Sequence, residues 1–152
     1  MLGGCASTTV DMSGPGARER WCDPSLSALV LWTPDWRPDQ KDVPAREAAA
    51  QRGIDRFFSG SGCFSKAVVH RSSTVEAGFQ RVIFIKVREL GPIVVIGSPS
   101  ILEGGTEVVL DIKVLDTPAE FRTHWKNGGA FVIKGVGTLE QDMAEALGAA
   151  FK

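Results

Sequence analysis

The sequence has few chemically reactive side chains. Among its 152 residues there are no tyrosines, two histidines and three cysteines, which limits the enzyme chemistries that it can support. It also lacks an excess of either charge: 17 basic residues face 18 acidic ones, so nothing in the total charge marks a nucleic-acid-binding protein. Hydrophobic residues make up 43% and charged residues 23%, which argues against a disordered chain and against a bundle of membrane spans. At this length we expect one globular domain.

Sequence motifs that carry catalysis are missing as well. The chain contains neither of the glycine-rich phosphate-binding patterns, G-x-x-x-x-G-K-[ST] and G-x-G-x-x-G, and it has no G-x-S-x-G turn. His70 and His124 are isolated, and no carboxylates stand at a spacing that suggests paired acid and base. We therefore predict that the protein is not an enzyme and that it holds no metal and no cofactor.

One short motif stands at the amino terminus. Residues Leu2 to Cys5 read Leu-Gly-Gly-Cys and resemble a bacterial lipobox, the signal that ends the signal peptide of a lipoprotein. In that family the cysteine is acylated and becomes the first residue of the mature protein. Only four residues precede Cys5, so we expect that the basic and apolar part of the signal peptide is missing from this sequence. The alternative is an ordinary amino-terminal cysteine in a cytosolic protein.

The segment after this motif is polar and has no apolar periodicity. We predict that residues 1–20 form the lipobox remnant and a flexible tether, and that residues 21–152 form a single α+β domain. The lipobox resemblance implies a periplasmic protein anchored to the cell envelope, with the outer membrane as the expected site. Acyl chains gain roughly 0.8 kcal/mol per buried methylene, so an acylated Cys5 would hold the protein without a transmembrane helix.

The two remaining cysteines, Cys22 and Cys63, are 41 residues apart. If Cys5 is acylated, the chain is exported, and the two should pair as a disulfide in an oxidising periplasm. No cysteine would then be left over. Two buried thiols or a metal site are the alternatives, although the sequence has no C-x-x-C spacing to favour a metal.

The hydrophobic pattern predicts strand, helix and strand in the first half of the domain. Residues 27–32 are a short apolar run that predicts a buried strand, and residues 33–41 predict a loop. Asp42 can cap a following helix that has Pro44 in its first turn. The apolar face of this helix is expected to comprise Ala50, Ile54, Phe57 and Phe58. Residues 66–70 predict a second short strand.

The second half predicts further strands and a closing helix. Residues 82–87 and 93–96 predict two strands or one bent strand, and the alternation at 106–114 predicts a half-buried antiparallel strand. Residues 121–126 predict another, which Asn127-Gly128 would turn back as a hairpin along residues 129–135. The last helix would open on a capping box of Thr138 to Gln141 and bury Leu139, Met143, Leu147 and Ala150.

These elements together predict the fold class. The expected architecture is an α+β two-layer sandwich, in which two main helices cover one face of a mixed, mostly antiparallel sheet. The expected order along the chain is β-α-β-β-β-β-β-α.

The combined features resemble a group of bacterial envelope lipoproteins that includes the curli-secretion lipoprotein, the penicillin-binding-protein activator lipoproteins and the TolB amino-terminal domain. The resemblance is carried by Cys5 and its tether, by the strand at 28–32 that leads into a helix, by the strands ending at Val114-Leu115-Asp116, and by the closing amphipathic helix. It implies a non-enzymatic periplasmic domain that docks onto other envelope proteins.

Two aromatic positions are candidates for such docking. Trp36 and Arg37 lie in the loop that leaves the first strand, and Trp125 lies beside the expected hairpin turn. Loops at strand ends often carry function, and tryptophan and arginine are enriched in interface hot spots. The alternatives are that Trp36 folds back over the core as a lid and that Trp125 pairs across strands.

The sequence therefore predicts a lipid-anchored periplasmic lipoprotein domain that acts by protein-protein association in envelope assembly or transport. We expect it to bind envelope proteins and to attach to the membrane through acylated Cys5. It could also form a homo-oligomer, and we expect no nucleic-acid partner. The alternative is a small periplasmic ligand-binding domain or enzyme with a pocket near Trp36 and Trp125.

Overall fold

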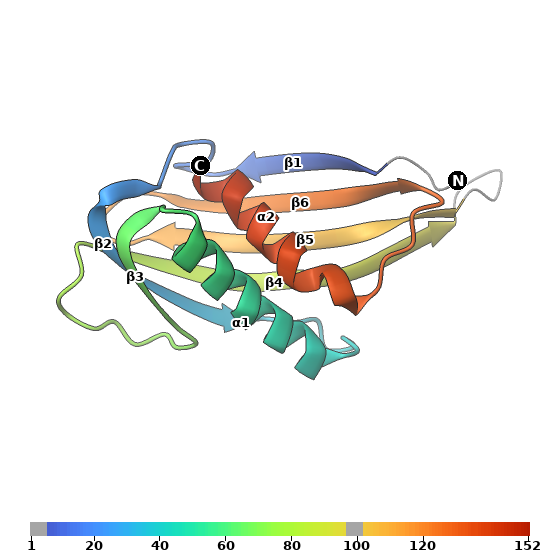
Figure 1. Cartoon of the computed structure of the whole chain (residues 1–152), viewed down its shortest axis with the longest axis horizontal. Coiled ribbons are helices and arrows are strands. Elements are labelled where there is room, and N and C mark those ends of the chain that lie inside the picture. Colours follow the sequence, from blue (N-terminus) through green and yellow to red (C-terminus); the bar gives the residue numbers. More distant parts are fainter. Residues whose placement is uncertain (1–5, 97–101) are drawn as a thin grey trace.

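The computed structural model describes residues 6–96 and 102–152, and shows a two-layer α+β sandwich (Figure 1). The strands are β1 (Ser7–Ser13), β2 (Asp23–Pro34), β3 (Phe64–His70), β4 (Arg81–Ile96), β5 (Leu102–Val114) and β6 (Glu120–Ala130). The helices are α1 (Val43–Gly60) and α2 (Leu139–Phe151), and a 3-10 turn, Val136–Thr138, precedes α2. The six strands form one sheet, and both helices lie on the same face of it. The predicted fold class is confirmed.

The sheet has the strand order β1-β6-β5-β4-β2-β3. β2 pairs in parallel with β3 and β4, because α1 carries the chain back across the sheet between β2 and β3. The other three pairings are antiparallel, so the sheet is mixed, as the sequence predicts.

The core lies between the sheet and the two helices. Both predicted helix faces are buried there, and the alternating inward positions of β2, β4, β5 and β6 complete it. α1 and α2 approach closely at Gly53, where an added Cβ would lie 2.6 Å from the Cβ of Met143. The absence of a side chain at this position is therefore what lets the two helices pack at this distance.

The predicted disulfide is confirmed. Cys22 and Cys63 are bonded, with their Cα atoms 4.4 Å apart. The bond joins the residue before β2 to the turn after α1, and the side chain of Cys63 is buried.

The prediction of a flexible tether is wrong for the described part of residues 1–20. Residues 7–13 form β1, which pairs along its whole length with β6, from Ser7 opposite Gly128 to Ser13 opposite Arg122. Val10 and Met12 pack against the core. β1 is an edge strand: it pairs only with β6, and only one of its faces packs against the core. It therefore contains few apolar residues, too few to give a clear alternating pattern in the sequence. Cys5 lies outside the described residues.

The predicted hairpin turn at Asn127-Gly128 is also wrong. β6 continues to Ala130, because both of its neighbours pair with this dipeptide: Asn127 lies opposite Thr8 on one side and Thr106 on the other. The Asn127 side chain donates to Thr8 Oγ1 at 2.9 Å. Pairing on both sides keeps the backbone extended, so the strand expected at 129–135 does not form beyond Ala130.

The two alternatives for residues 82–96 are resolved in favour of one bent strand. β4 is continuous and has a bulge between Val87 and Glu89. Just after the bulge, the buried guanidinium of Arg46 from α1 donates to the carbonyl of Leu90. An added Cβ on Gly91 would overlap this guanidinium, so a side chain at position 91 would displace the end of Arg46 from its contact with Leu90.

The predicted helix caps sit at the correct positions but work differently. Asp42 and Thr138 are the N-cap residues of α1 and α2, yet neither side chain caps its helix. Asp42 has a left-handed backbone with φ 56°, and Thr138 Oγ1 donates instead to Asp142 Oδ2 at 2.9 Å. The capping-box prediction for α2 is therefore wrong in its contacts.

Candidate functional site: the charged face of the sheet

The face of the sheet opposite the helices divides into two parts. On β2 and the start of β4, Leu29, Leu31 and Val82 form a small apolar cluster that Phe79, Phe84 and their neighbours partly cover. On β4, β5 and β6, most of the positions that alternate with the core residues carry charges. We call the second part the charged face; its members are Lys86, Arg88, Glu107, Asp111, Arg122 and His124.

Short ion pairs connect the centre of the charged face. Arg122 and Asp111 lie directly opposite each other on β6 and β5, and two hydrogen bonds of 2.6 and 2.9 Å join them. Arg88 extends the network, since its Nη1 lies 2.9 Å from Asp35 Oδ2 and 3.8 Å from Asp111 Oδ2. The hydrogen bonds from Arg122 hold the pKa of Asp111 below its usual value, and the same contact raises the pKa of Arg122.

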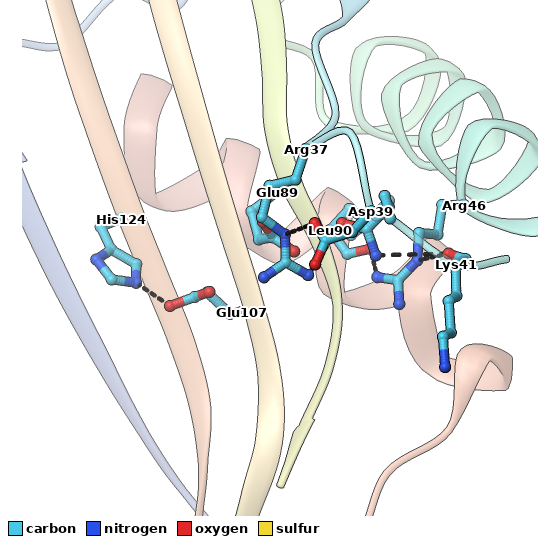
Figure 2. A network of polar contacts seen from close by, with 9 residues as sticks. Arg37, Asp39, Lys41, Arg46, Glu89, Leu90, Glu107 and His124 are labelled. Carbon is cyan, nitrogen blue, oxygen red and sulfur yellow. Dashed lines mark hydrogen bonds and ion pairs between the residues drawn. The ribbon is translucent and has the colours of Figure 1, made fainter. Parts of the chain in front are cut away.

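A second polar group lies further along the same strands, near the loop after β2 (Figure 2). His124 Nε2 lies 2.7 Å from Glu107 Oε2, and Arg37 Nε lies 3.6 Å from Glu89 Oε2. Burial raises the pKa of Glu89; Arg37 opposes this shift and the nearby Glu107 adds to it. Glu89 is thus the carboxylate of this group whose ionised form is disfavoured.

The charged face contains two open hollows of about 540 Å³ each. The first lies over the middle strands and is lined by Lys86, Asp111 and Arg122, among others. The second lies next to the loop after β2 and is lined by Trp36, Arg37 and charged residues of β4 to β6. Arg122 borders both, so the two hollows form neighbouring parts of one surface.

Two of the three predicted interaction residues border the second hollow. Trp36 is half-buried against the core and donates from Nε1 to Glu47 Oε2 at 2.9 Å, which matches the alternative that this residue folds back as a lid. Arg37 is exposed and reaches the charged face through Glu89. The loop therefore contributes its arginine, more than its tryptophan, to the accessible surface.

The prediction of Trp125 as an interaction residue is wrong. Its side chain is 2% exposed and lies in the core between the sheet and the helices, so it lines neither hollow. Trp125 follows His124 on an extended strand, and consecutive side chains point to opposite faces. Of the pocket expected near Trp36 and Trp125, only the hollow beside Trp36 forms, and Trp125 does not line it.

The ion-pairing residues of β6, Arg122 and His124, were not among the predicted site residues. The alternation of β5 places Glu107 and Asp111 on the polar side, and a similar alternation is visible in Arg122 and His124. What the sequence did not show is the register that sets Asp111 opposite Arg122.

Two further properties of the described residues concern metal binding and membrane spans. The described part of the chain brings together no group of three histidine, cysteine, aspartate or glutamate side chains that could hold a metal ion. None of the helices within residues 6–96 and 102–152 is both long and apolar enough to cross a membrane.

The comparisons with known proteins concern the fold. No family model matches the sequence, and no curated protein matches it significantly. A dodecamer of a PelC variant from Paraburkholderia phytofirmans has a similar structure, with a TM-score of 0.50 and 11% identity over 94% of this chain and 96% of that chain. A second PelC dodecamer from the same organism has a TM-score of 0.49 and 12% identity, with the same coverage. A DUF330 protein from Xanthomonas campestris has a TM-score of 0.46 and 14% identity over 86% of this chain and 82% of that one. At these identities the first likeness establishes a shared fold and nothing further.

Proposed function

We propose that this chain is a non-catalytic, lipid-anchored domain of the bacterial envelope that works by binding other protein chains, copies of itself among them. The observation that carries the proposal is the charged face: a broad, open part of the sheet that neither helix of the described residues covers and that presents both signs of charge. Such a surface suits a partner of complementary charge pattern, because electrostatic complementarity fixes register and excludes wrong partners.

The ion pairs of the charged face fit this role better than a purely structural one. Arg88, Asp111 and Arg122 are all accessible to solvent, and exposed ion pairs contribute little to folding, at a median of about 0 to 1 kcal/mol. Their groups can therefore exchange partners at small cost when another chain covers the face.

Self-association is supported by the kind of protein that shares the fold. PelC, the structural neighbour described above, is recorded as a dodecamer. We propose that this chain likewise forms a homo-oligomer, and that envelope proteins are its other partners, as the resemblance to envelope lipoproteins implies.

The proposed compartment rests on the cysteines. A disulfide such as Cys22–Cys63 persists in oxidising surroundings and is rare in the cytosol of most organisms, so it supports export. Export in turn agrees with acylation of Cys5 in the lipobox-like Leu-Gly-Gly-Cys. Mass spectrometry of the protein produced with a complete signal peptide tests this part, and an unmodified Cys5 would contradict it.

Sedimentation of the full chain tests the role of the charged face. We expect the wild-type protein to sediment as an assembly and Arg122→Glu to shift it toward the monomer. Arg52→Glu is the matched control, because Arg52 is a similarly exposed arginine with a 2.8 Å ion pair to Glu140 on the helical side. A wild-type chain that stays monomeric, and that also captures no protein through a photo-crosslinker at position 122 in the native envelope, would overturn the proposal.

A further inference from the structure

Exposed apolar side chains gather at one end of the molecule. Within the described residues, five of the six large hydrophobic side chains that are exposed lie at the end of β4 or in the segment that joins β6 to α2. We call this set the apolar tip; its members are Val94, Ile96, Phe131, Ile133 and Val136. Ile96 and Ile133 are the most exposed, at 73% and 70%.

The two parts of the apolar tip are neighbours in space. Ile96 is paired with Leu102 across the β4–β5 ladder, and the backbone amide of Phe131 donates to the carbonyl of Leu102 at 2.6 Å. Figure 1 shows the end of β4, the start of β5 and the connection from β6 to α2 at the same end of the sheet. The two segments that carry the tip therefore lie side by side.

Phe131 has a backbone conformation that calls for an explanation. Its φ of 59° lies in the left-handed region, which is unfavourable for a residue with a large side chain, and the residue is 59% exposed. Packing within the described residues therefore does not compensate for this conformation. Strain of this kind is concentrated at functional sites.

The amino-terminal end of the described chain lies beside the apolar tip. β1 runs antiparallel to β6, and Ser7 lies opposite Gly128, close to the end of β6 where the segment with Phe131 begins. Cys5 is two residues before Ser7, and two residues of chain reach at most about 7 Å. Acyl chains on Cys5 would thus enter a bilayer next to the tip.

We propose that the apolar tip rests on the phospholipid surface in which the acyl chains of Cys5 are embedded. This inference depends on the anchor in the proposed function and adds an orientation to it: the end of the sheet with the tip faces the membrane. The segment 131–135 lies outside helices and strands, so its backbone cannot enter the hydrocarbon layer, where polar groups find no partners. Its apolar side chains enter the headgroup boundary instead, as in other interfacial segments.

Hydrogen exchange on vesicles tests the orientation with the full chain. The thiol of Cys5 is coupled to a maleimide phospholipid in vesicles of phosphatidylethanolamine and phosphatidylglycerol, while Cys22 and Cys63 are protected by their disulfide. We expect amide exchange in residues 132–135 to slow on the vesicles relative to the uncoupled protein, because these residues lie outside helices and strands. Exchange around Val75, the exposed hydrophobic residue outside the tip, should not change.

Substitutions show whether the side chains of the apolar tip cause the slower exchange on the vesicles. Phe131→Ser combined with Ile133→Ser should abolish the slowing, and Ile96→Ser should weaken it without affecting folding, since that side chain is exposed. Val75→Ser is the matched control and should retain the full effect.

Two outcomes would overturn the inference. Equal exchange at the tip with and without vesicles would show that lipid does not cover it, and slowing that appears at high protein concentration without vesicles would assign the tip to a second copy of the chain. Because the coupling supplies the anchor chemically, neither outcome depends on acylation of Cys5 in the cell, which mass spectrometry decides separately.

Discussion

At the scale of single residues, the charged face responds to pH in two opposite ways. The pKa of Asp111 is lowered by the hydrogen bonds from Arg122, so its ionised form stabilises the fold. The pKa of Glu89 is raised by burial, so its ionised form costs stability until the carboxyl group is protonated. We therefore expect Asp111 to titrate below the ordinary pKa of an aspartate and Glu89 to titrate above that of a glutamate. NMR of the side-chain carboxyl carbons measures both titrations.

The contribution of Asp111 can be isolated by substitution. We expect Asp111→Asn to lower the free energy of unfolding at neutral pH by less than about 1 kcal/mol, because the pair is partly exposed to solvent. This contribution is present above the ordinary pKa of 3.8 and disappears as the pH falls through the lower pKa of the folded state. Urea unfolding at neutral and at strongly acidic pH measures it. Asp39→Asn is the control, because Asp39 is 85% exposed; an equal effect of both substitutions would contradict the prediction.

At the scale of secondary-structure elements, the contact between α1 and α2 depends on one position. Gly53 faces α2, and an added Cβ would also lie 2.8 Å from the carbonyl oxygen of Glu140. Backbone atoms of a packed helix move little, so the two helices would have to separate to admit a methyl group. Their separation would in turn loosen the core that both helices cover.

Gly53→Ala should therefore destabilise the protein although alanine is the better helix former. The gain in helix propensity is about 1 kcal/mol, whereas overpacking a dense core typically costs about 1–3 kcal/mol. Thermal unfolding followed by circular dichroism measures the net effect. Gly60→Ala is the matched control, since it lies in the same helix with no atom near its added Cβ, and it should be neutral or stabilising. A Gly53→Ala protein as stable as Gly60→Ala would refute the close approach of the helices.

At the scale of the whole molecule, the segment before β2 is joined to the end of α2 close to the disulfide. The amides of Trp21 and Cys22 both donate to the carbonyl of Phe151 at the end of α2, and Trp21 also stacks on Phe121 of β6 with ring centroids 6.5 Å apart. The disulfide ties this junction to Cys63 at the end of α1. The ends of both helices are thus linked to the start of β2 and to β6 at one end of the sheet, opposite the apolar tip.

Removal of the disulfide should weaken the whole fold. Replacing Cys22 and Cys63 together by alanine should lower the free energy of unfolding by about 4 kcal/mol in the chain-entropy model, because the bond closes a loop of 41 residues. Chemical denaturation of the variant and the wild type measures the loss. Cys5→Ala serves as the control and should leave stability unchanged; a stability loss in the control alone would contradict the assignment of the two cysteines.

Features that depend only on residues close together in the sequence could be predicted from the sequence. The apolar run of β2 and the buried faces of α1 and α2 follow from periodicity, which is a property of each segment alone. The order of these elements was enough for the fold class, and Arg37 could be identified as a residue of the accessible surface. The predicted order lacked β1, and it left open whether residues 82–96 form two strands or the one bent strand that the structure has.

Features that depend on which strands become neighbours were decided by the tertiary structure. Asn127-Gly128 favours a turn in isolation, but hydrogen bonding to a strand on each side keeps it extended. The same pairing makes a strand of residues 7–13, which are too polar to predict one, and it sets Arg122 opposite Asp111. Local propensities amount to fractions of a kilocalorie per residue, whereas a paired backbone inside a sheet gains hydrogen bonds and burial together, so strand pairing outweighs the local preference.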